Sequence, residues 1–409
     1  MPAPTRPARP TRAYNQWVPP LIFRRGLDLK HEVSSLLATS YHSDLVARIK
    51  EEGFRYESGR LTIHLAREFG FCYGVDRAVD YAYQACKRFP DRQVFLTGEI
   101  IHNPHVNDQL RDQGVRFLSD PVESIGRLTA ADVVILPAFG VTIEMLLQLE
   151  RHGCTLVDTT CGSVLNVWKN VRRYAEDGFT SVIHGKHWHE ETQATASQAR
   201  NAGIGHYLVV LNESEAGVAC DYIRRGGDSS SFLARFERAV SAGFDPDREL
   251  QLIGCANQTT MLSSESLTIG EMFRAAIADR YGEAAVAERF RAFDTICSAT
   301  QDRQDAVRAL IEERTLDLML VIGGYNSSNT CNLTRMCAAR LPTFHVAEPS
   351  CIVSSAEIRH KPVGRTEEIS SDAWLPATGP IRLGLTAGAS TPDNLVGDAI
   401  RRLEHLAGY

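Results

Sequence analysis

From about residue 58 onward, short apolar runs alternate along the chain with stretches that have the periodicity of amphipathic helices. Each run has the length of a strand and ends in a polar or glycine-containing turn, after which a helical stretch begins. Runs of this kind occupy residues 61–66, 155–158 and 293–296, among others. A repeated strand, turn and helix is typical of layered sheets and helices, so the pattern predicts an α/β fold.

Three of these turns contain a cysteine in nearly the same setting. The tetrapeptide Asp-Thr-Thr-Cys ends at Cys161, Asp-Thr-Ile-Cys ends at Cys297, and Cys72 also precedes a predicted helix. The similarity of the turns indicates an internal repeat and predicts three pseudo-equivalent α/β domains. With an N-terminal extension placed first, the predicted segments are 1–57, 58–157, 158–293 and 294–409.

Three segments depart from the repeat. Residues 1–57 are rich in proline and arginine and then helix-like from 31 to 52, which is typical of an extension added before the main fold. Residues 212–250, within the second domain, and residues 353–378 contain many polar residues and turn formers. We predict both to be insertions or long surface loops.

Composition narrows the class of protein. The 409 residues are 44% hydrophobic and 23% charged, which is the mixture of a folded chain of two or three domains. The net charge of -6 argues against a broad basic surface, so we expect no nucleic-acid partner. No apolar run approaches the roughly 20 residues that span a bilayer, and we expect no membrane partner.

The first residues lack the apolar core of a secretion signal. They are rich in arginine and free of acidic residues before Asp28, as organelle transit peptides are, but a cytoplasmic protein is our preferred interpretation over one of the plastid stroma. Ten cysteines in such a chain favour buried thiols, metal ligands or catalysis over structural disulfides.

Cys72, Cys161 and Cys297 are candidate metal ligands. A helix N-terminus stabilises a thiolate, and three converging thiolates leave one position of a metal centre unfilled. Such a set suits zinc with a fourth ligand or an iron-sulfur cluster with one iron that lacks a protein ligand. Any single cysteine is more often a packing residue. We interpret the other seven as structural, namely Cys86, Cys154, Cys220, Cys255, Cys331, Cys337 and Cys351.

Polar side chains recur at other predicted strand-to-helix turns. Free backbone N–H groups and the helix dipole favour a bound phosphate or diphosphate there, and histidine and serine side chains add donors. Each such residue taken alone is more often a helix cap. The candidates for an anion pocket are His102, His189, Ser327, Asn329 and Ser390.

Glu191 and Thr260 are candidates for proton transfer. A carboxyl group in a closed pocket can deliver protons, and a nearby hydroxyl can carry them to a leaving group. The acidic pair at 190–191 is explained equally well as favourable charge at a helix N-terminus. The pair therefore supports a catalytic role only within a wider site.

Taken together, these motifs resemble the 4-hydroxy-3-methylbut-2-enyl diphosphate reductase (LytB) family, whose reaction is the last step of the methylerythritol phosphate route to isoprenoids. The matching stretches run in family order from about residue 60 to the C-terminus. They are residues 70–78, 101–103, 158–161, 185–192, 258–260, 296–304, 326–329 and 386–392.

The resemblance implies a cloverleaf of three α/β domains around a central four-iron four-sulfur cluster held by Cys72, Cys161 and Cys297, with one iron free of protein ligands. It implies a two-electron reductive dehydroxylation that gives isopentenyl and dimethylallyl diphosphate, with an external electron donor such as ferredoxin or flavodoxin. Glu191, Thr260 and His189 would act in catalysis. The substrate diphosphate would be bound by His102, His189, Thr260, Ser327, Ser328, Asn329 and Ser390.

One departure concerns the anion pocket. Many bacterial members of the family have a His-Gly pair where this chain has Phe139 and Gly140, so one diphosphate donor is missing. The Phe139 form, the extension and the insertions resemble the longer plant and cyanobacterial branch.

Two other functions remain open on the sequence. One is an aconitase-like hydro-lyase, and the other is an iron-sulfur sensor or a zinc-stabilised ligand-binding protein. Glu191 beside His189 argues against a sensor, because a sensor needs no proton donor at its bound anion.

Overall fold

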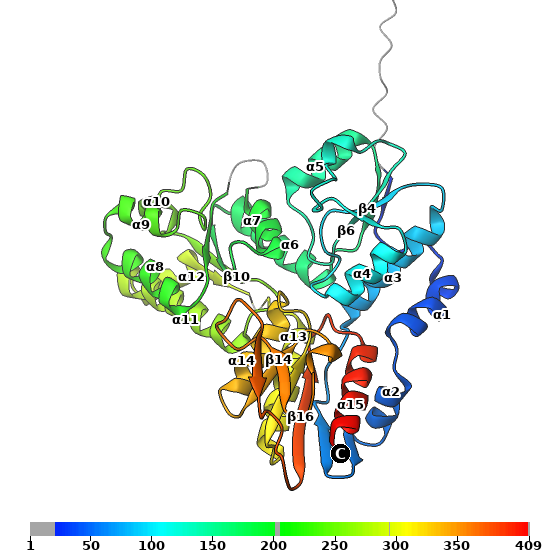
Figure 1. Cartoon of the computed structure of the whole chain (residues 1–409). Coiled ribbons are helices and arrows are strands. Elements are labelled where there is room, and N and C mark those ends of the chain that lie inside the picture. The colour runs from blue at the N-terminus through cyan, green and yellow to red at the C-terminus, as the bar shows by residue number, and fades with distance from the viewer. Residues whose placement is uncertain (1–20, 201–204, 294, 408–409) are drawn as a thin grey trace, which may run out of the picture.

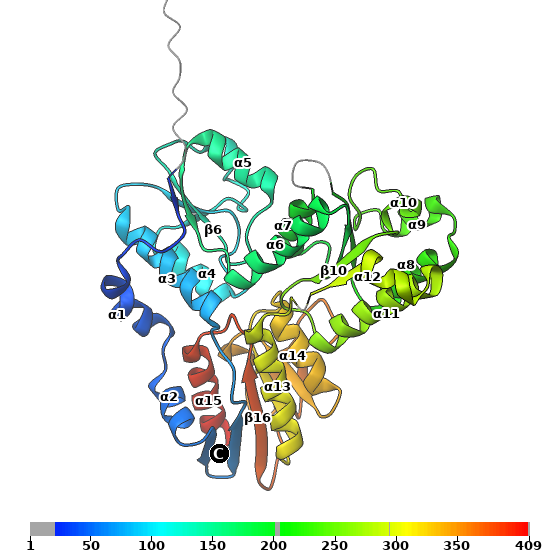
Figure 2. The ribbon, with the colours of Figure 1, turned by 180° about the vertical axis from the view of Figure 1, so that it is seen from behind.

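Three sheets covered by helices form three lobes around a common centre (Figure 1). The computed structural model describes residues 21–200, 205–293 and 295–407. The first lobe is at the upper right of Figure 1, the second at the left and the third at the bottom, and the view from behind in Figure 2 shows the same separation. The predicted α/β fold of three units is confirmed.

The first lobe has a parallel sheet in which alternate residues of each strand face opposite helical layers. Val133 and Ile135 pack toward the helices that contain Val79 and Val106, whereas Val134 and Leu136 belong to the core on the other face. The sheet order is β1 (Ile22–Phe23), β7 (Thr155–Asp158), β6 (Val133–Leu136), β4 (Val94–Leu96) and β5 (Arg116–Phe117). The helices are α1 (Lys30–Tyr41), α3 (Tyr73–Arg88), α4 (Pro104–Asp112) and α5 (Ile143–His152).

The second lobe has a four-stranded parallel sheet. Its order is β11 (Phe290–Ala292), β10 (Ile253–Asn257), β8 (Thr180–His184) and β9 (Tyr207–Val210). The helices are α6 (Gly162–Glu176), α7 (Glu190–Ala199), α8 (Glu213–Arg225), α9 (Ser229–Arg235), α10 (Pro246–Glu249), α11 (Ser263–Tyr281) and α12 (Val286–Arg289). Val167 and Val171 of α6 pack with Ala199 in one core, and Ile223 of α8 packs with Ile277 of α11 in another.

Residues 212–250 were predicted to be an insertion or a long surface loop. The prediction of a loop is wrong, because α8, α9 and α10 occupy this segment. Ile223 and Phe232 are fully buried among them, and each such side chain contributes roughly 1.5–3 kcal/mol. The side chains of Asn212 and Asp228 accept from backbone N–H groups at the starts of α8 and α9. These capping residues could have indicated the helices in the sequence. The polar outer faces of the helices, however, made the segment resemble a loop.

The third lobe has a sheet of the order β13 (Thr343–Val346), β12 (Leu318–Ile322), β16 (Ile381–Ala387), β3 (Leu61–Leu65) and β2 (Arg55–Ser58). All pairs in it are parallel except β2 with β3. The buried residues of α2 (Asp44–Glu51) and α15 (Asp393–Ala407) share one core, and those of α13 (Ser298–Glu313) and α14 (Ser328–Ala338) share the other. The sheet is therefore covered on both faces.

Residues 353–378 were also predicted to be an insertion or a surface loop. They contain the antiparallel pair β14 (Glu357–His360) and β15 (Ile369–Asp372). Trp374, just after this pair, is buried in the core of the third lobe and donates from Nε1 to the Ser354 carbonyl at 2.9 Å. The segment is a structured hairpin that packs on the lobe.

Sheet membership differs from the sequential boundaries at the N-terminal side. β1, which lies within the predicted extension, pairs with β7 of the first sheet. β3, which the sequence places directly before the first cysteine turn, pairs with β16 in the third sheet. A strand that is apolar on its core-facing side fits several sheets equally well, so only the tertiary arrangement decides which one it joins.

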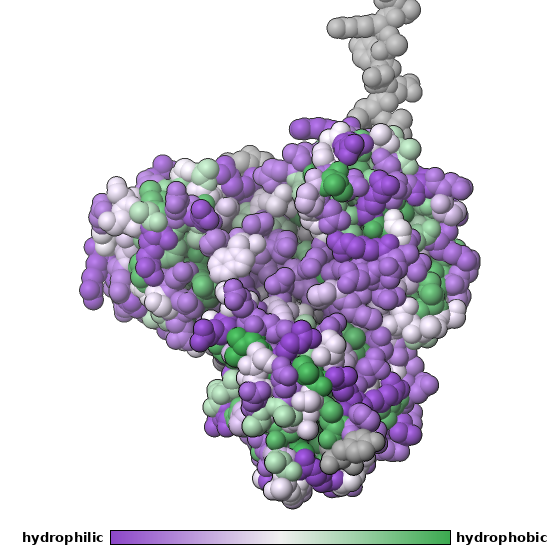
Figure 3. All heavy atoms as spheres, in the orientation of Figure 1, coloured by the Kyte–Doolittle hydropathy of each residue, from purple (hydrophilic) through white to green (hydrophobic). Residues whose placement is uncertain are grey.

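The surface seen in Figure 3 is covered mainly by polar residues, with apolar residues in separate small groups. Among the described helices, none is long and apolar enough to cross a bilayer.

Candidate functional site

Turns from all three lobes line one cavity of about 110 Å³. The turns follow the carboxyl ends of the strands, as is general for ligand sites in α/β sheets. All of the site residues predicted from the sequence line this cavity: Cys72, Cys161, Cys297, His102, His189, Glu191, Thr260, Ser327, Ser328, Asn329 and Ser390.

Each of the three cysteines is the N-cap residue of a helix. Cys72 precedes α3, Cys161 precedes α6 and Cys297 precedes α13. Gly74 lets two of these turns approach each other, because a Cβ atom at Gly74 would lie 2.6 Å from Cys161 Sγ and 3.9 Å from Cys72 Sγ. The three matching turns predicted from the sequence therefore converge in space.

Burial and nearby polar groups shift the pKa values of the thiols in opposite directions. Burial raises the pKa of Cys72 and raises the pKa of Cys297 to about 11. The backbone of Val75 beside Cys72, and hydrogen bonds from Thr300 to Cys297, partly counter these shifts. At Cys72 and Cys297, desolvation therefore outweighs the groups at the helix N-termini that favour the thiolates. A bound metal reverses this balance, since it deprotonates a coordinating thiol.

Two arginines, Arg303, which is buried, and Arg77, which is half-buried, hold the backbone of the thiol turns. Arg303 donates to the Gly70 carbonyl at 2.7 Å, and Arg77 donates to the Thr159 carbonyl at 3.2 Å. Their Nε atoms are buried and have no hydrogen-bond partner. The positive charge of Arg303 favours the Cys72 thiolate, so the two guanidinium groups suit a negatively charged centre at these turns.

The spacing of the sulfurs distinguishes between metal centres. Thiolates on one tetrahedral zinc ion lie about 3.8 Å apart, given a Zn–S bond of about 2.3 Å. Among the described residues, the group of three ligand atoms that all lie within 4.8 Å of one another is His102, His189 and Glu190, and the three sulfurs form no such group. The thiols therefore fit a centre with more than one metal atom better than a single zinc ion.

His102 and His189 form a directed chain of hydrogen bonds. The Glu191 N–H donates to His189 Nδ1 at 3.2 Å, which assigns the ring hydrogen of His189 to Nε2. That Nε2 lies 3.1 Å from His102 Nε2, and His102 Nδ1 lies 2.7 Å from Glu99 Oε2. Burial lowers the pKa of His189 well below 6.5, so His189 is a neutral donor at neutral pH.

Phe139 lies against this histidine pair. Its ring stacks on the His102 ring with centroids 4.8 Å apart and planes 12° apart. It also meets the His189 ring edge-on, with centroids 6.1 Å apart. Phe139 thus contributes no hydrogen bond to the cavity, as its side chain dictates, but it forms the wall that holds His102 in place.

Glu191 is fully enclosed at the first turn of α7. Its Oε1 atom accepts from the Thr259 N–H at 2.6 Å, and burial raises the pKa of the carboxyl to about 7. The hydrogen bonds from Thr259 oppose that rise only in part. A carboxyl group with a pKa near 7 is suited to general acid catalysis at neutral pH.

The hydroxyl turns come mainly from the third lobe. Ser327 caps α14, and the Ser390 Oγ lies 3.4 Å from the Ser327 Oγ. Asn329 accepts from the Ala389 N–H through Oδ1 at 2.9 Å, while its buried Nδ2 has no hydrogen-bond partner. An unpaired amide donor facing a lined cavity indicates a missing acceptor, and a phosphate oxygen satisfies that requirement.

Sequence reasoning missed the residue that connects these groups. The Gln258 side chain is 1% exposed, and its Nε2 donates to Thr260 Oγ1 at 2.9 Å and to Ser328 Oγ at 3.2 Å. Thr260 is therefore bound to Gln258, whereas the backbone contact of Glu191 is with Thr259. Gln258 stood within a matching motif, but nothing local marks a glutamine as the centre of a network.

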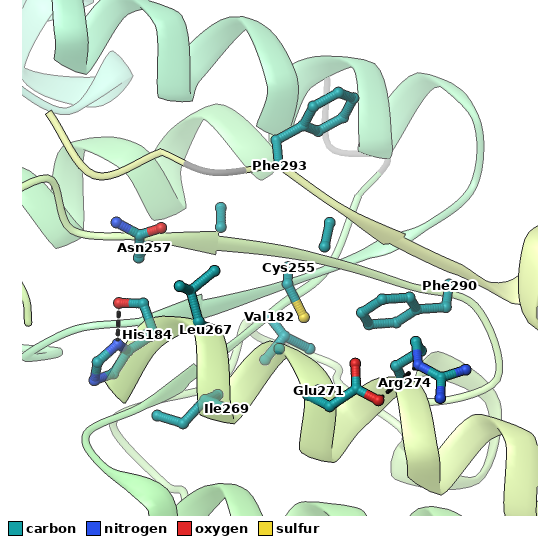
Figure 4. A pocket seen from close by; sticks show the side chains of 14 residues that line it. Val182, His184, Cys255, Asn257, Leu267, Ile269, Glu271, Arg274, Phe290 and Phe293 are labelled. Atoms are coloured by element: carbon teal, nitrogen blue, oxygen red, sulfur yellow. Dashed lines mark hydrogen bonds and ion pairs between the residues drawn. The ribbon is translucent and has the colours of Figure 1, made fainter. Parts of the chain in front are cut away.

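A second pocket lies in the second lobe, between β10 and α11 (Figure 4). Its lining is mainly apolar, and two pairs of its polar side chains bond to each other. His184 Nδ1 lies 2.8 Å from Ser266 Oγ, and Arg274 donates to Glu271 at 2.8 Å. His184 Nε2 is buried there without a hydrogen-bond partner. The thiol-lined cavity is the better candidate for chemistry because it gathers three thiols, a buried carboxyl group and several hydroxyl groups.

The fold and the cavity define a three-lobed α/β protein with converging thiols at one side of a central cavity and anion donors at the other. The chain belongs to the family described as LytB protein, whose model matches residues 63–404.

The chain is similar to proteins named 4-hydroxy-3-methylbut-2-enyl diphosphate reductase. One from Synechococcus is 47% identical over 388 residues, which cover 94% of this chain and 95% of the relative. One from Gloeobacter violaceus is 47% identical over 393 residues, with coverages of 94% and 93%. The solved structure of the corresponding reductase from Plasmodium falciparum matches 83% of this chain and 86% of its own, with a TM-score of 0.60 and 19% identity, which supports the fold alone.

Proposed function

We propose that this chain reduces 4-hydroxy-3-methylbut-2-enyl diphosphate to isopentenyl and dimethylallyl diphosphate, as its relatives are named to do. The observation that carries the proposal is the single cavity that combines three thiols, a buried carboxyl group and a set of anion donors. A hydro-lyase or sensor function is not favoured, because the relatives are named reductases over nearly the whole chain.

Cys72, Cys161 and Cys297 would hold a four-iron four-sulfur cluster. When bound, such a cluster supplies single electrons and an open iron that acts as a Lewis acid. Gly74 leaves space between two of the sulfurs, and Arg303 and Arg77 place positive charge beside the turns. The spacing of the thiols and the charge around them support this assignment.

The polar turns would bind and orient the substrate diphosphate. The unpaired Asn329 Nδ2 is a donor that needs no proton uptake. His189 Nε2–H would donate to the anion in exchange for its contact with His102 Nε2. The hydroxyl groups of Ser327, Ser328 and Ser390 add donors whose hydrogens can rotate toward an anion. Contacts from His102 and Thr260 complete the set that we assign to substrate binding.

Glu191 would supply the proton that lets the substrate hydroxyl leave as water. Its raised pKa keeps a large fraction of the carboxyl protonated at neutral pH, and its burial excludes bulk water from competing. We assign supporting roles in this proton transfer to His189, which holds the Glu191 backbone, and to Thr260 on the neighbouring turn.

Two further elements of the proposal concern the cell. The reaction consumes two electrons, and an external carrier such as ferredoxin or flavodoxin would deliver them. We propose the cytoplasm as the compartment in which the reaction takes place.

The test is anaerobic oxidation of reduced viologen by the cluster-loaded protein, with and without 4-hydroxy-3-methylbut-2-enyl diphosphate. We expect oxidation that depends on this substrate. If no such oxidation occurs although the cluster is verified to be intact, the proposal is contradicted, and the hydro-lyase or sensor function is favoured.

A further inference from the structure

The hydroxyl group of Ser328 has an unusual pair of neighbours. Its Oγ atom lies 3.0 Å from Lys186 Nζ and 3.2 Å from Gln258 Nε2, and both of these are donors. A hydroxyl oxygen has two acceptor lone pairs and one hydrogen. With both lone pairs occupied, the hydrogen of Ser328 is left to donate, and Ser328 lines the cavity.

The orientation of Gln258 in this arrangement is determined independently. Its Oε1 atom accepts from the Lys186 backbone N–H and from Thr192 Oγ1, each at 3.2 Å. The amide nitrogen must therefore be the atom that faces Ser328 and Thr260. Lys186 thus contacts the same network twice, with its backbone at one end and its ammonium group at the other.

Lys186 carries a charge without an acidic partner. Among the described residues, the lysines that form ion pairs are Lys50 and Lys87, and Lys186 forms none. Its side chain is partly buried in the loop before α7. Burial lowers its pKa from 10.5, the Cys331 thiol opposes this shift, and the nearby Lys361 and Arg335 add to it. A cation kept in such a place is costly unless an anion arrives to compensate it.

The other donors of the anion pocket bring little positive charge to match a diphosphate. Ser327, Asn329 and Ser390 are uncharged, and His189 is neutral because of its burial. His102 shares its Nδ1 contact with the carboxylate of Glu99. Phe139 offers no donor where bacterial relatives were expected to have histidine.

We propose that Lys186 is a positioning residue for the diphosphate, because its ammonium group polarises the Ser328 hydroxyl and supplies the charge that the other donors lack. This inference deepens the proposed function and rests on it. Lys186 does not line the cavity itself, so it acts through Ser328 and through its field.

The test uses inorganic diphosphate as the probe and the cluster-loaded full chain as the protein. Lys186→Met should weaken diphosphate binding by about 10- to 100-fold, the cost of losing a charged hydrogen bond, as measured by calorimetric titration. The KM for 4-hydroxy-3-methylbut-2-enyl diphosphate should rise by a similar factor, while kcat should change less. Lys186→Arg should restore most of the affinity.

Two controls separate this role from a structural one. Lys169→Met removes one positive charge from an exposed position on α6 and should leave the affinity within about twofold of wild type. In the second control, the double variant Lys186→Met/Ser328→Ala should bind about as weakly as the single variants, because the two residues act as one unit. Iron content and thermal midpoint should be unchanged throughout.

Three results would overturn the inference. They are wild-type affinity in Lys186→Met, additive effects in the double variant, and a loss of affinity that Arg does not restore. If Lys186→Met fails to fold, Lys186→Gln and the Ser328→Ala comparison decide the same question. Diphosphate binding that depends on Lys186 in a protein without reductase activity would contradict the proposed function and leave this inference standing.

Discussion

The thiol turns and the hydroxyl turns of the cavity are held in different ways. The Cys72 and Cys161 side chains form no capping hydrogen bond, and only Cys297 bonds with Thr300. In contrast, the hydroxyl turns are bonded across lobes: Ser328 contacts Lys186 and Gln258 of the second lobe, and the Ser390 carbonyl accepts from Asn103 of the first.

The difference follows from the chemistry of the two ligands. A metal ligand must keep its lone pairs free, so the backbone has to determine its position. Here Arg303 and Arg77 hold that backbone by donating to its carbonyl groups. An anion donor gains from being oriented before binding, because less order is then lost on association. Glu191 interacts with both halves of the cavity, the thiol half with the three cysteines and the anion half with the histidine and hydroxyl donors. Its charge raises the pKa of Cys297, and His102 lowers the pKa of Glu191.

The largest effect on turnover is expected from replacing Glu191, which interacts with both the thiol half and the anion half of the cavity. Glu191→Gln should slow turnover by about 100- to 10,000-fold, because an amide cannot deliver the proton. Cluster content and diphosphate affinity should stay near wild type. Viologen oxidation, iron analysis and titration with inorganic diphosphate check the three statements, and unchanged turnover would exclude Glu191 as the proton donor.

The same group predicts a pH dependence of stability. The folded pKa of Glu191, about 7, lies above its ordinary value of 4.5, so the native state retains a proton that the unfolded state loses between these pH values. This contribution is complete below pH 4.5 and is lost as pH rises to 7. Glu191→Gln should therefore gain about 3 kcal/mol over wild type at pH 8.

Denaturant unfolding at pH 5 and pH 8 measures this difference. The advantage of Glu191→Gln should be small at pH 5 and nearly complete at pH 8. An equal difference between the two proteins at both pH values would mean that the carboxyl is not desolvated as the structure has it.

Gly74→Ala tests the thiol half alone. The new methyl group would lie 2.6 Å from Cys161 Sγ, so the turn must shift, at a cost of about 1–3 kcal/mol in unfolding free energy. Iron content should fall, whereas affinity for inorganic diphosphate should change little. Gly162→Ala is the matched control, because a Cβ there meets nothing within 4 Å. Equal iron content in the two variants would contradict the close approach of Gly74 to Cys161 Sγ.

The smallest effect is expected from Phe139→Leu in the anion half. Loss of the stacked ring should free His102 and weaken diphosphate binding by about 2- to 10-fold, the value of an aromatic pair. Iron content should be unchanged. Stronger binding by this variant would show that the Phe139 ring does not support His102.

Much of the site was predictable because its residues stand in local patterns. A cysteine between a strand and a helix predicted each thiol turn, and all three became N-caps facing one cavity. The helices at 212–250 were missed although Asn212 and Asp228 cap them, because polar outer faces hide the periodicity of short helices. The roles of Gln258 and Lys186 were missed because each depends on a partner about 70 residues or more away.

By itself the sequence determined the α/β alternation, the three thiol turns and the order of the motifs, since these depend on side chains within a few residues of one another. The tertiary structure alone decided that β3 joins the third sheet, that His189 donates to His102, that the pKa of Glu191 rises to about 7 and that Lys186 contacts Ser328. Desolvation, tautomers and the pairing of distant strands depend on which surfaces meet, and the chain specifies those surfaces only through the packing of all three lobes.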